Sequence, residues 1–379
     1  MINLIHGAID IERTPDGLLP YRLPAWARAQ CPDPSLAMAA SQPSGVRLSF
    51  QTSATSIELD TLPTKRVYSG MAPRPDGIYD LNVDGKLMRQ LSAKGGKTMK
   101  IDMAAGVSSM EPGEVQTLRF VDLPDGVKTI DIWLPHDETT ELIDLRANAT
   151  VIPLAETNNR RWLHHGSSIS QGSNAASPSG IWPAVAARLA GVDLLNLGLG
   201  GNALLDPFIA RTMRDLPADR ISLKIGINLV NTDLLRLRAL APAVHGFLDT
   251  IRDGHPTTPM LLISPLYCPI HEDTPGPCLL DAAALGEGRL RFRATGDRSE
   301  VRLGKLTLRI IREQLRAIVQ QRQANDPHLY YLDGNDLYGP GDNALMPLPD
   351  ELHPGADAHQ LIGKRFYGFG FLTKALNRS

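Results

Sequence analysis

Hydrophobic and polar residues alternate with a period of two in the first part of the chain. Val46, Leu48 and Phe50 are separated by polar residues, and later segments repeat this pattern. Such alternation is typical of β-strands with one buried face, and the pair Asp84-Gly85 between two of them is a common hairpin turn. Because no long amphipathic helix interrupts the pattern, we expect an antiparallel, jelly-roll-like β-sandwich here.

After about residue 157 the pattern changes to short apolar runs separated by helical stripes. The apolar runs lie at residues 162–165, 192–197, 221–227, 260–264 and 328–332. The stripes between them carry apolar residues three or four positions apart, as in Leu240, Val244, Leu248 and Ile251. Strands that alternate with helices predict a parallel sheet with helices on both faces, which is the doubly wound α/β architecture.

The change of period predicts two domains in this chain of 379 residues. We expect residues 1–155 to form the β-sandwich and residues 156–379 to form the α/β domain. The segment 269–302 is polar, contains Pro and Gly, and is longer than ordinary loops. Such a segment beside a rigid scaffold often serves as a lid or a pocket wall.

Composition and charge exclude several classes of binding partner and indicate the cellular compartment. The formal net charge of −2 gives no electrostatic footprint for nucleic acid or for an anionic membrane. No uninterrupted apolar run is long enough for a membrane span, and the first 17 residues do not have the layout of a signal peptide. The chain has three cysteines, too few for a disulfide framework or a four-cysteine zinc site. We therefore expect a cytoplasmic protein.

Polar side chains follow the predicted parallel strands where those strands end. The four segments are residues 166–172 (GSSISQG), 196–202 (NLGLGGN), 226–228 (GIN) and, in a Pro-rich loop after the last strand, 350–353 (DELH). Because the carboxyl ends of parallel strands meet at one edge of a sheet, we expect these segments to converge. A hydroxyl, exposed backbone amides, a carboxamide and an Asp/His pair are the groups that acyl transfer requires.

The four segments, in this order, resemble the conserved blocks of the SGNH (GDSL-like) hydrolase family. The preceding sandwich makes the chain similar to the bacterial two-domain esterases of that family. The resemblance implies a flavodoxin-like catalytic domain and a serine esterase that acts on a small acyl ester, with no cofactor and no metal. It implies Ser168 as nucleophile, His353 as general base and Asp350 as the residue that orients His353. The oxyanion hole would comprise the backbone amides of Ser168 and Gly201 and the side chain of Asn228.

The chain departs from the family pattern at two positions next to these residues. Ser167 stands where the family has an Asp before the nucleophile, and Leu229 stands where an Asp usually follows the third block. The Asp-Leu-Tyr motif of the related N-terminal domains has only an approximate counterpart in residues 80–85 (DLNVDG). The departures at Ser167 and Leu229 concern the surroundings of the site and its substrate range more than its reaction.

Asn231 is a second candidate for the oxyanion amide. The alternation of the predicted strand 221–227 places Asn228 at its carboxyl end. Asn231 is better placed to cap a helix that begins near Thr232 or Asp233. We therefore expect Asn228 to serve the oxyanion and Asn231 to serve the helix.

Alternative functions remain open at this point. Residues 198–203 (GLGGNA) fit a dinucleotide-binding fingerprint, but the next predicted strand ends without the Asp or Glu that would hold the ribose. An acyltransferase could use the same serine to deliver the acyl group to an alcohol or amine. The non-enzymatic alternative is a carbohydrate-type binding protein on a silent SGNH scaffold.

Overall fold

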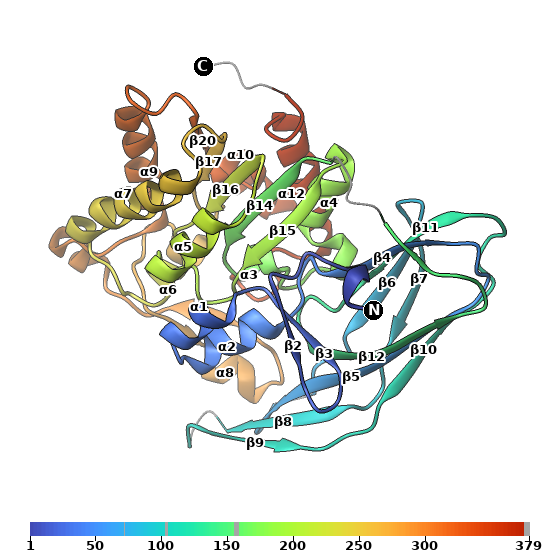
Figure 1. Cartoon of the computed structure of the whole chain (residues 1–379). Coiled ribbons are helices and arrows are strands. Elements are labelled where there is room, and N and C mark those ends of the chain that lie inside the picture. The colour runs from blue at the N-terminus through green and yellow to red at the C-terminus, as the bar shows by residue number, and fades with distance from the viewer. Residues whose placement is uncertain (72, 103–104, 155–158, 375–379) are drawn as a thin grey trace. The chain divides into compact units, whose positions relative to one another are not determined.

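The computed structural model describes residues 1–71, 73–102, 105–154 and 159–374, and contacts within the chain divide it into two compact units (Figure 1). The first unit comprises Met1–Ala25, Ala37–Asn158 and Ser177–Ser179, and the second comprises Trp26–Leu36, Asn159–Ala176 and Gly180–Ser379. The expected boundary between residues 155 and 156 lies outside the described residues. The early segment Trp26–Leu36 belongs to the second unit, and Ser177–Ser179 belongs to the first. A single domain boundary in the sequence therefore does not describe the two units.

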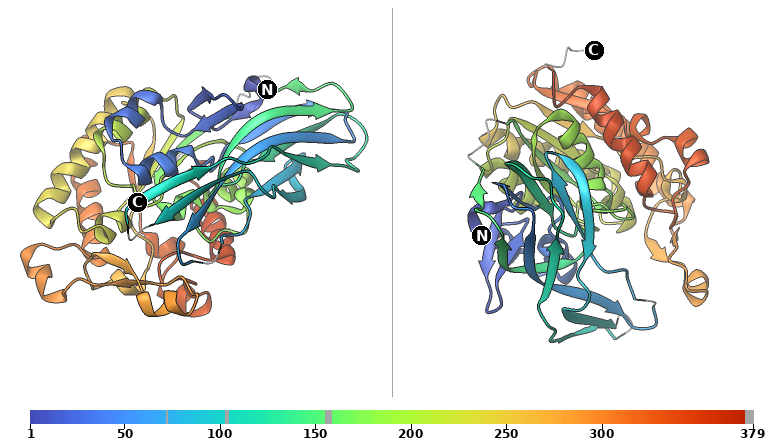
Figure 2. Two further views of the ribbon diagram at one scale, coloured as in Figure 1. Left: turned by 90° about the horizontal axis from the view of Figure 1, so that it is seen from below. Right: turned by 90° about the vertical axis from the view of Figure 1, so that its right-hand side faces the viewer.

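Two β-sheets form the first unit (Figure 2). One sheet has the order β1 (Ile5–His6), β4 (Arg47–Thr52), β11 (Lys128–Trp133), β6 (Ile78–Val83), β7 (Lys86–Ser92), with β13 (Ile152–Pro153) also paired to β4. The other has the order β2 (Asp10–Arg13), β3 (Leu18–Tyr21), β12 (Thr139–Ala147), β5 (Ile57–Tyr68), β8 (Lys97–Asp102), β9 (Val107–Glu111), with β10 (Gln116–Phe120) also paired to β5. The pairings are antiparallel except that of β5 with β8.

The period-two pattern places one face of each sheet in a shared core. Leu48 and Phe50 of β4 belong to the same buried cluster as Leu59 of β5 and Leu142 of β12, so the two sheets pack face to face. The predicted hairpin turn at Asp84-Gly85 joins β6 to β7, and both residues have positive φ, as a type I′ turn requires. The predicted sandwich is therefore confirmed.

Asp80 of β6 breaks the expected alternation because it is buried although it lies on the polar phase of the strand. One of its carboxylate oxygens, Oδ2, accepts hydrogen bonds from the hydroxyl of Ser177 at 2.6 Å and from the backbone N–H and hydroxyl of Ser179 at 2.9 and 2.6 Å. The other oxygen, Oδ1, accepts one from Gln90 at 2.8 Å. The approximate motif at residues 80–85 thus places a fully hydrogen-bonded carboxylate inside the first unit.

The second unit contains a five-stranded parallel sheet. Its order is β15 (Asp193–Gly198), β14 (Arg161–Gly166), β16 (Arg220–Lys224), β17 (Met260–Ile263), β20 (Leu329–Leu332). This 2-1-3-4-5 order is that of the flavodoxin-like doubly wound fold. The prediction of a parallel sheet is confirmed, and the strand ends differ from the expected ones by at most three residues.

Helices cover both faces of this sheet, as Figure 1 shows. On one face α4 (Trp182–Ala190) packs against α12 (Ala356–Phe369), and on the other α5 (Pro207–Asp215) packs against α7 (Leu237–Gly254), which also contacts α9 (Leu308–Arg322). Successive residues of β14 point to these two faces: the ring of His164 lies 4.8 Å from Trp182, whereas that of His165 lies 5.9 Å from Phe247 of α7. Four shorter α-helices are α1 (Ala25–Gln30), α2 (Pro34–Ser41), α10 (Gly334–Leu337) and α11 (Pro340–Leu345).

The predicted strand 221–227 is wrong at its carboxyl end. The strand stops at Lys224, and Ile227 already begins helix α6 (Ile227–Asn231). Gly226 causes the change because its φ of 130° turns the chain, and a Cβ there would press against Pro265. An apolar run of this length fits a strand or a buried helix turn equally well, so its periodicity alone could not reveal the switch.

The segment expected as a long loop has secondary structure of its own. We call residues 269–303 the insert. Strands β18 (Cys278–Leu280) and β19 (Phe292–Ala294) pair as an antiparallel hairpin that includes helix α8 (Ala282–Gly286). Turns of 3₁₀ helix at Pro269–His271 and Arg298–Leu303 form its two ends. Among all the described helices, none is both long and apolar enough to cross a membrane.

Candidate active site

The sheet order brings the ends of β14 and β16 side by side. The order of connection reverses between these two strands, and open parallel sheets bind ligands at such a switch point. Strand β14 leads directly into the short helix α3 (Ser168–Gln171), and β16 leads into α6. Ser168 and Asn228 therefore lie in the first turns of two helices that begin at neighbouring strand ends.

Glycines allow α3 to sit tightly on the sheet. A Cβ at Gly198, the last residue of β15, would collide with the backbone nitrogen of Gln171. A Cβ at Gly166, the last residue of β14, would collide with the side chain of Ser170. The two glycines thus fix how closely the helix that carries Ser168 approaches the strands.

Ser168, His353 and Asp350 form a continuous chain of hydrogen bonds. The Oγ of Ser168 lies 2.9 Å from Nε2 of His353, and Nδ1 of His353 lies 2.8 Å from Oδ2 of Asp350. An arrangement of this kind can move a proton from a hydroxyl to an imidazole while the carboxylate holds the ring and stabilises the imidazolium.

The turn that Asp350 begins also fixes its carboxylate. Oδ1 accepts the backbone N–H groups of Leu352 and His353 at 3.0 and 2.7 Å. Oδ2 accepts the side-chain amide of Asn174 at 3.2 Å in addition to the imidazole. Glu351 adopts a left-handed conformation with a φ of 68°, which closes the turn. Both oxygens of the carboxylate are therefore engaged.

The surroundings of Asp350 favour its ionised form. Burial is the largest single influence and acts to raise the pKa of this carboxyl. Hydrogen bonds from the side chain and backbone of His353, together with the attraction to its imidazole, act in the opposite direction and prevail, so the pKa lies below its usual value. An ionised Asp350 is the form that stabilises a positively charged His353.

The glycine-rich segment after β15 lies beside Ser168. The backbone N–H of Gly200 donates to Oε1 of Gln171 at 2.7 Å, and a Cβ at Gly200 would lie 3.5 Å from the Cβ of Ser168. The next residue, Gly201, has a φ of 74°, a conformation that favours glycine. Gly201 therefore directly follows Gly200, the residue that packs on Ser168.

Asn228 is tied to the same glycine-rich segment. Its side chain is buried, and its Oδ1 accepts the backbone N–H of Ala203 at 3.1 Å. Because the oxygen is the acceptor of this bond, Nδ2 is the end of the amide that can donate to a ligand. An amide held in this way keeps its orientation without rearrangement during a reaction.

The expected helix cap at Asn231 is wrong. Asn231 is the last residue of α6, and the next helix, α7, begins only at Leu237 with Arg236 as its N-cap. The Oδ1 of Asn231 is buried without a hydrogen-bond partner among the described atoms. The helix expected near Thr232 starts earlier because Gly226 ends β16 early, which makes Asn231 a C-terminal residue.

Ser167, which replaces the family Asp, caps the helix that carries Ser168. It is fully buried, has extended backbone angles, and its Oγ accepts the backbone N–H of Ile169 at 3.4 Å. A hydroxyl oxygen at this position satisfies one of the free amides of the first helical turn. The other departure, Leu229, is buried within α6.

Comparison with known proteins agrees with this geometry. Residues 159–268 match the model of the GDSL-like lipase/acylhydrolase family, and residues 4–142 match the model of the N-terminal domain of SsfX3. The second half of the chain thus contains a domain that matches the GDSL-like family. The two matches together give a two-domain architecture, and the GDSL-like match begins two residues before β14, the strand that leads to Ser168. A search of curated proteins finds no match.

Solved structures show the same two-part architecture. The chain is similar to the salicylyl-acyltransferase SsfX3 from a tetracycline biosynthetic pathway, with 28% identity and a TM-score of 0.77 over 96% of this chain and 92% of that one. A Bacteroides ovatus protein assigned as a GDSL-like lipase is 18% identical, with a TM-score of 0.66 over 96% and 93%. A family two carbohydrate esterase from Clostridium thermocellum, solved with cellohexaose, is 13% identical, with a TM-score of 0.56 over 86% and 91%. The last two likenesses concern the fold alone.

A second serine–histidine contact lies beneath the GDSL-like site. Nε2 of His164 lies 2.8 Å from Oγ of Ser170, and its Nδ1 lies 2.7 Å from Oγ of Ser222, which also accepts the indole N–H of Trp162 at 2.8 Å. All four residues are fully buried, and burial lowers the pKa of His164 far below its usual value. This network anchors α3 to the sheet, away from solvent.

Several residues around the GDSL-like site carry no signal in the sequence. The side-chain amide of Asn174 donates to Oδ2 of Asp350 at 3.2 Å and to the carbonyl of His353 at 3.4 Å, and Gln171 accepts the backbone N–H of Gly200. Ser35 of the early segment accepts the side-chain amide of Asn202 at 3.1 Å. Lys224 ends β16 in a fully buried position, and burial lowers its pKa to about 7. Of these residues, only Gln171 and Asn202 lie inside a block that the sequence singles out.

Proposed function

We propose that the protein cleaves a small carboxylic ester through an acyl-enzyme intermediate on Ser168. The observation that carries this proposal is the unbroken chain from Oγ of Ser168 through His353 to Asp350, with distances of 2.9 and 2.8 Å. The family supports the same class of reaction, since its members are lipases and acylhydrolases.

In the first step Oγ of Ser168 attacks the acyl carbonyl carbon while Nε2 of His353 takes the hydroxyl proton. His353 then delivers this proton to the departing alcohol, which leaves the acyl group on the serine. Water, activated by the same imidazole, attacks the acyl-enzyme, and the carboxylic acid leaves with Ser168 restored. Asp350 keeps Nδ1 of His353 protonated, so that Nε2 faces the serine as the acceptor.

The negative charge that forms on the carbonyl oxygen needs donors. We assign the backbone N–H groups of Ser168 and Gly201 and the Nδ2 group of Asn228 to this task. The supporting observations are the position of Ser168 at the start of α3, the packing of the neighbouring Gly200 on Ser168, and the bond between Ala203 and Asn228. A helix N-terminus adds a favourable field for a developing anion.

Acyl transfer is the second candidate. The observation that favours it is the similarity to SsfX3 over 96% of this chain, which includes the N-terminal domain as well as the GDSL-like domain. An acyltransferase uses the same first half-reaction and differs only in the group that attacks the acyl-enzyme, which is an alcohol or amine instead of water. The distinction therefore lies in the acceptor and not in Ser168, His353 or Asp350.

A panel of activated esters tests both candidates. The purified protein would be mixed with p-nitrophenyl acetate, butyrate, octanoate and salicylate, alone and with competing alcohols and amines, and the free acid and the transferred product would be measured separately. We expect release of p-nitrophenol that depends on Ser168, with the split between acid and transfer product deciding the class. No release above that of Ser168→Ala with any donor would reject both.

A further inference from the structure

The insert holds the Asp350–His353 turn at three points. The backbone N–H of Phe292 in β19 donates to the carbonyl of Asp350 at 2.9 Å, and the ring of Phe292 meets the His353 imidazole edge to face, with centroids 5.6 Å apart and an angle of 75°. The neighbouring Arg291 forms an ion pair with Glu351 at 3.3 Å. The hairpin therefore contacts both the residue that orients the imidazole and the imidazole itself.

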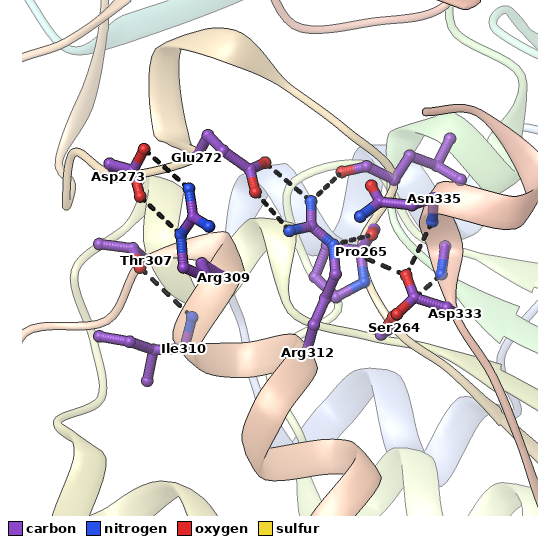
Figure 3. A network of polar contacts seen from close by, with 12 residues as sticks. Ser264, Pro265, Glu272, Asp273, Thr307, Arg309, Ile310, Arg312, Asp333 and Asn335 are labelled. Atoms are coloured by element: carbon purple, nitrogen blue, oxygen red, sulfur yellow. Dashed lines mark hydrogen bonds and ion pairs between the residues drawn. The ribbon is translucent and has the colours of Figure 1, made fainter. Parts of the chain in front are cut away.

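A buried arginine fixes the start of the insert. Figure 3 shows Arg312 of α9 with its guanidinium between the carboxylate of Glu272 and the backbone after β17. Its Nη groups lie 2.6 and 2.8 Å from the two oxygens of Glu272, and its Nε donates to the carbonyl of Pro265 at 3.0 Å. Arg312 is only 5% exposed, and a buried, fully hydrogen-bonded pair of this kind breaks only at high cost. Next to it, Arg309 pairs with Asp273 at 2.8 and 3.1 Å.

The insert is also tied to the residues around α6. Lys305, just past the insert, lies 2.9 Å from Asp233 and 2.8 Å from Glu300. A Cβ at Gly276 would collide with the carbonyl oxygen of Val230 in α6, so the insert packs directly on the helix that contains Asn228. With both ends held, the insert is fixed in its contacts with the Asp350–His353 turn and with α6.

The position of Phe292 has a chemical consequence. Both the departing alcohol and the incoming acceptor exchange a proton with His353, and each must therefore come within hydrogen-bond distance of its Nε2. The ring of Phe292 packs on this same imidazole, and this contact is the basis for placing Phe292 beside the space where these groups bind. An aromatic ring there offers an apolar face to an organic acceptor and displaces water that would otherwise hydrolyse the acyl-enzyme.

We propose that Phe292 is a specificity-determining residue that borders the acceptor side of the site and favours an alcohol or amine with an apolar or aromatic body over water. The proposal rests on the proposed acyl-enzyme function and names its acceptor class. It concerns the second half-reaction, since acylation of Ser168 needs only the groups described above.

The test measures how the acyl-enzyme divides between water and added alcohols. The wild-type protein, Phe292→Ala and Phe292→Leu would be acylated with p-nitrophenyl acetate in the presence of 2-phenylethanol or of methanol. The acetate ester of each alcohol and free acetate would be quantified, and the initial burst of p-nitrophenol would count working sites. The control is Leu279→Ala, which removes an exposed apolar side chain from the opposite strand of the same hairpin.

For Phe292→Ala we expect the ratio of 2-phenylethyl acetate to free acetate to fall about 5- to 10-fold, the size of one lost aromatic contact. The ratio with methanol should change less than about twofold, because methanol is too small to pack on the ring. The ratio of 2-phenylethyl acetate to free acetate for Phe292→Leu should lie between those of the wild type and Phe292→Ala. The ratio for Leu279→Ala should match that of the wild type. A residue that only stabilises the hairpin would lower the burst without changing the ratios.

Equal ratios in all four proteins, or an equal fall with both alcohols, would overturn the role of Phe292 while the burst shows the acyl-enzyme intact. A wild-type protein that gives no burst and no ester product would instead reject the proposed function, and with it the acceptor assignment. The burst thus separates the two failures.

Discussion

Asp350 holds His353 from two directions. Its Oδ1 accepts the backbone N–H of His353 at 2.7 Å, and its Oδ2 lies 2.8 Å from Nδ1 of the same residue. The first bond fixes the position of the residue and the second fixes the direction of its ring. One side chain thus sets both the place and the tautomer of the proposed base.

Replacing Asp350 by Asn should therefore separate chemistry from folding. The amide keeps the shape of the turn but no longer enforces a protonated Nδ1, and kcat should fall by about 10⁴-fold, as for the comparable change in a serine protease. Steady-state kinetics and circular dichroism would be compared with Asp357→Asn, which removes a charge from an exposed position at the start of α12. An Asp350→Asn protein with nearly normal kcat would remove Asp350 from the mechanism.

Asn228 and Asn231 provide a matched pair within one short helix. Loss of the Asn228 amide should lower kcat about 10²- to 10³-fold with little change in KM, because the amide is assigned to the transition state only. Asn231→Ala should leave kcat nearly unchanged, since its Oδ1 has no hydrogen-bond partner among the described groups. The reverse pattern would move the oxyanion donor to Asn231.

The acid limb of the pH profile of kcat/KM should reflect the loss of a single proton. His353 must be neutral to accept a proton from Ser168, so kcat/KM should rise with pH on the acid side of the profile. The lowered pKa of Asp350 favours the ionised form of that carboxylate there. The plot of log kcat/KM should thus have a limiting slope of about one, the value for a single proton. A slope near two would mean that Asp350 also titrates there.

Lys224 should make the stability of the protein depend on pH. Burial lowers its pKa to about 7 in the folded protein, whereas an unfolded lysine has a pKa of about 10.4. Between these values the unfolded chain binds more protons, so the free energy of unfolding should increase with pH, by at most about 1.4 kcal/mol per pH unit. Below pH 7 both states are protonated and the slope disappears.

The measurement compares urea unfolding of the wild type and Lys224→Met from pH 6 to 10. The difference in unfolding free energy should shift in favour of the wild type as pH rises. Since all other groups are shared, curves that remain parallel would show that Lys224 titrates normally in the folded protein.

Much of the site could be predicted because its residues follow strands. In a parallel sheet the carboxyl ends of all strands meet, so Ser168, Gly201, Asn228 and the turn after β20 converge whatever the lengths of the connections. The alternation of strands and helices in the second unit was predicted from the hydrophobic periodicity. Patterning alone was enough for these features because each depends on local periodicity and on one general property of sheets.

The remaining features depend on contacts between distant segments. Phe292 lies in a polar stretch with no apolar period, and its position is revealed only by its contacts with Asp350 and His353. Ser35 belongs to a segment that comes early in the chain yet lies beside Asn202. Lys224 continues an apolar strand, and only its neighbours decide that its amine is buried. The early end of β16 followed from the conformation of one glycine, Gly226.

Covalent labelling tests the central claim most directly. A fluorophosphonate reacts with a serine only where a base activates the hydroxyl and donors receive the developing negative charge. Mass spectrometry of the wild type, Ser168→Ala and Ser170→Ala would locate the adduct. We predict one adduct per chain, on Ser168 of the wild type, and no adduct on Ser168→Ala. Ser170→Ala should still carry the adduct, because the Ser170 hydroxyl of the wild type lies in the buried network with His164. An unlabelled wild type, or an adduct that persists in Ser168→Ala, would contradict the account.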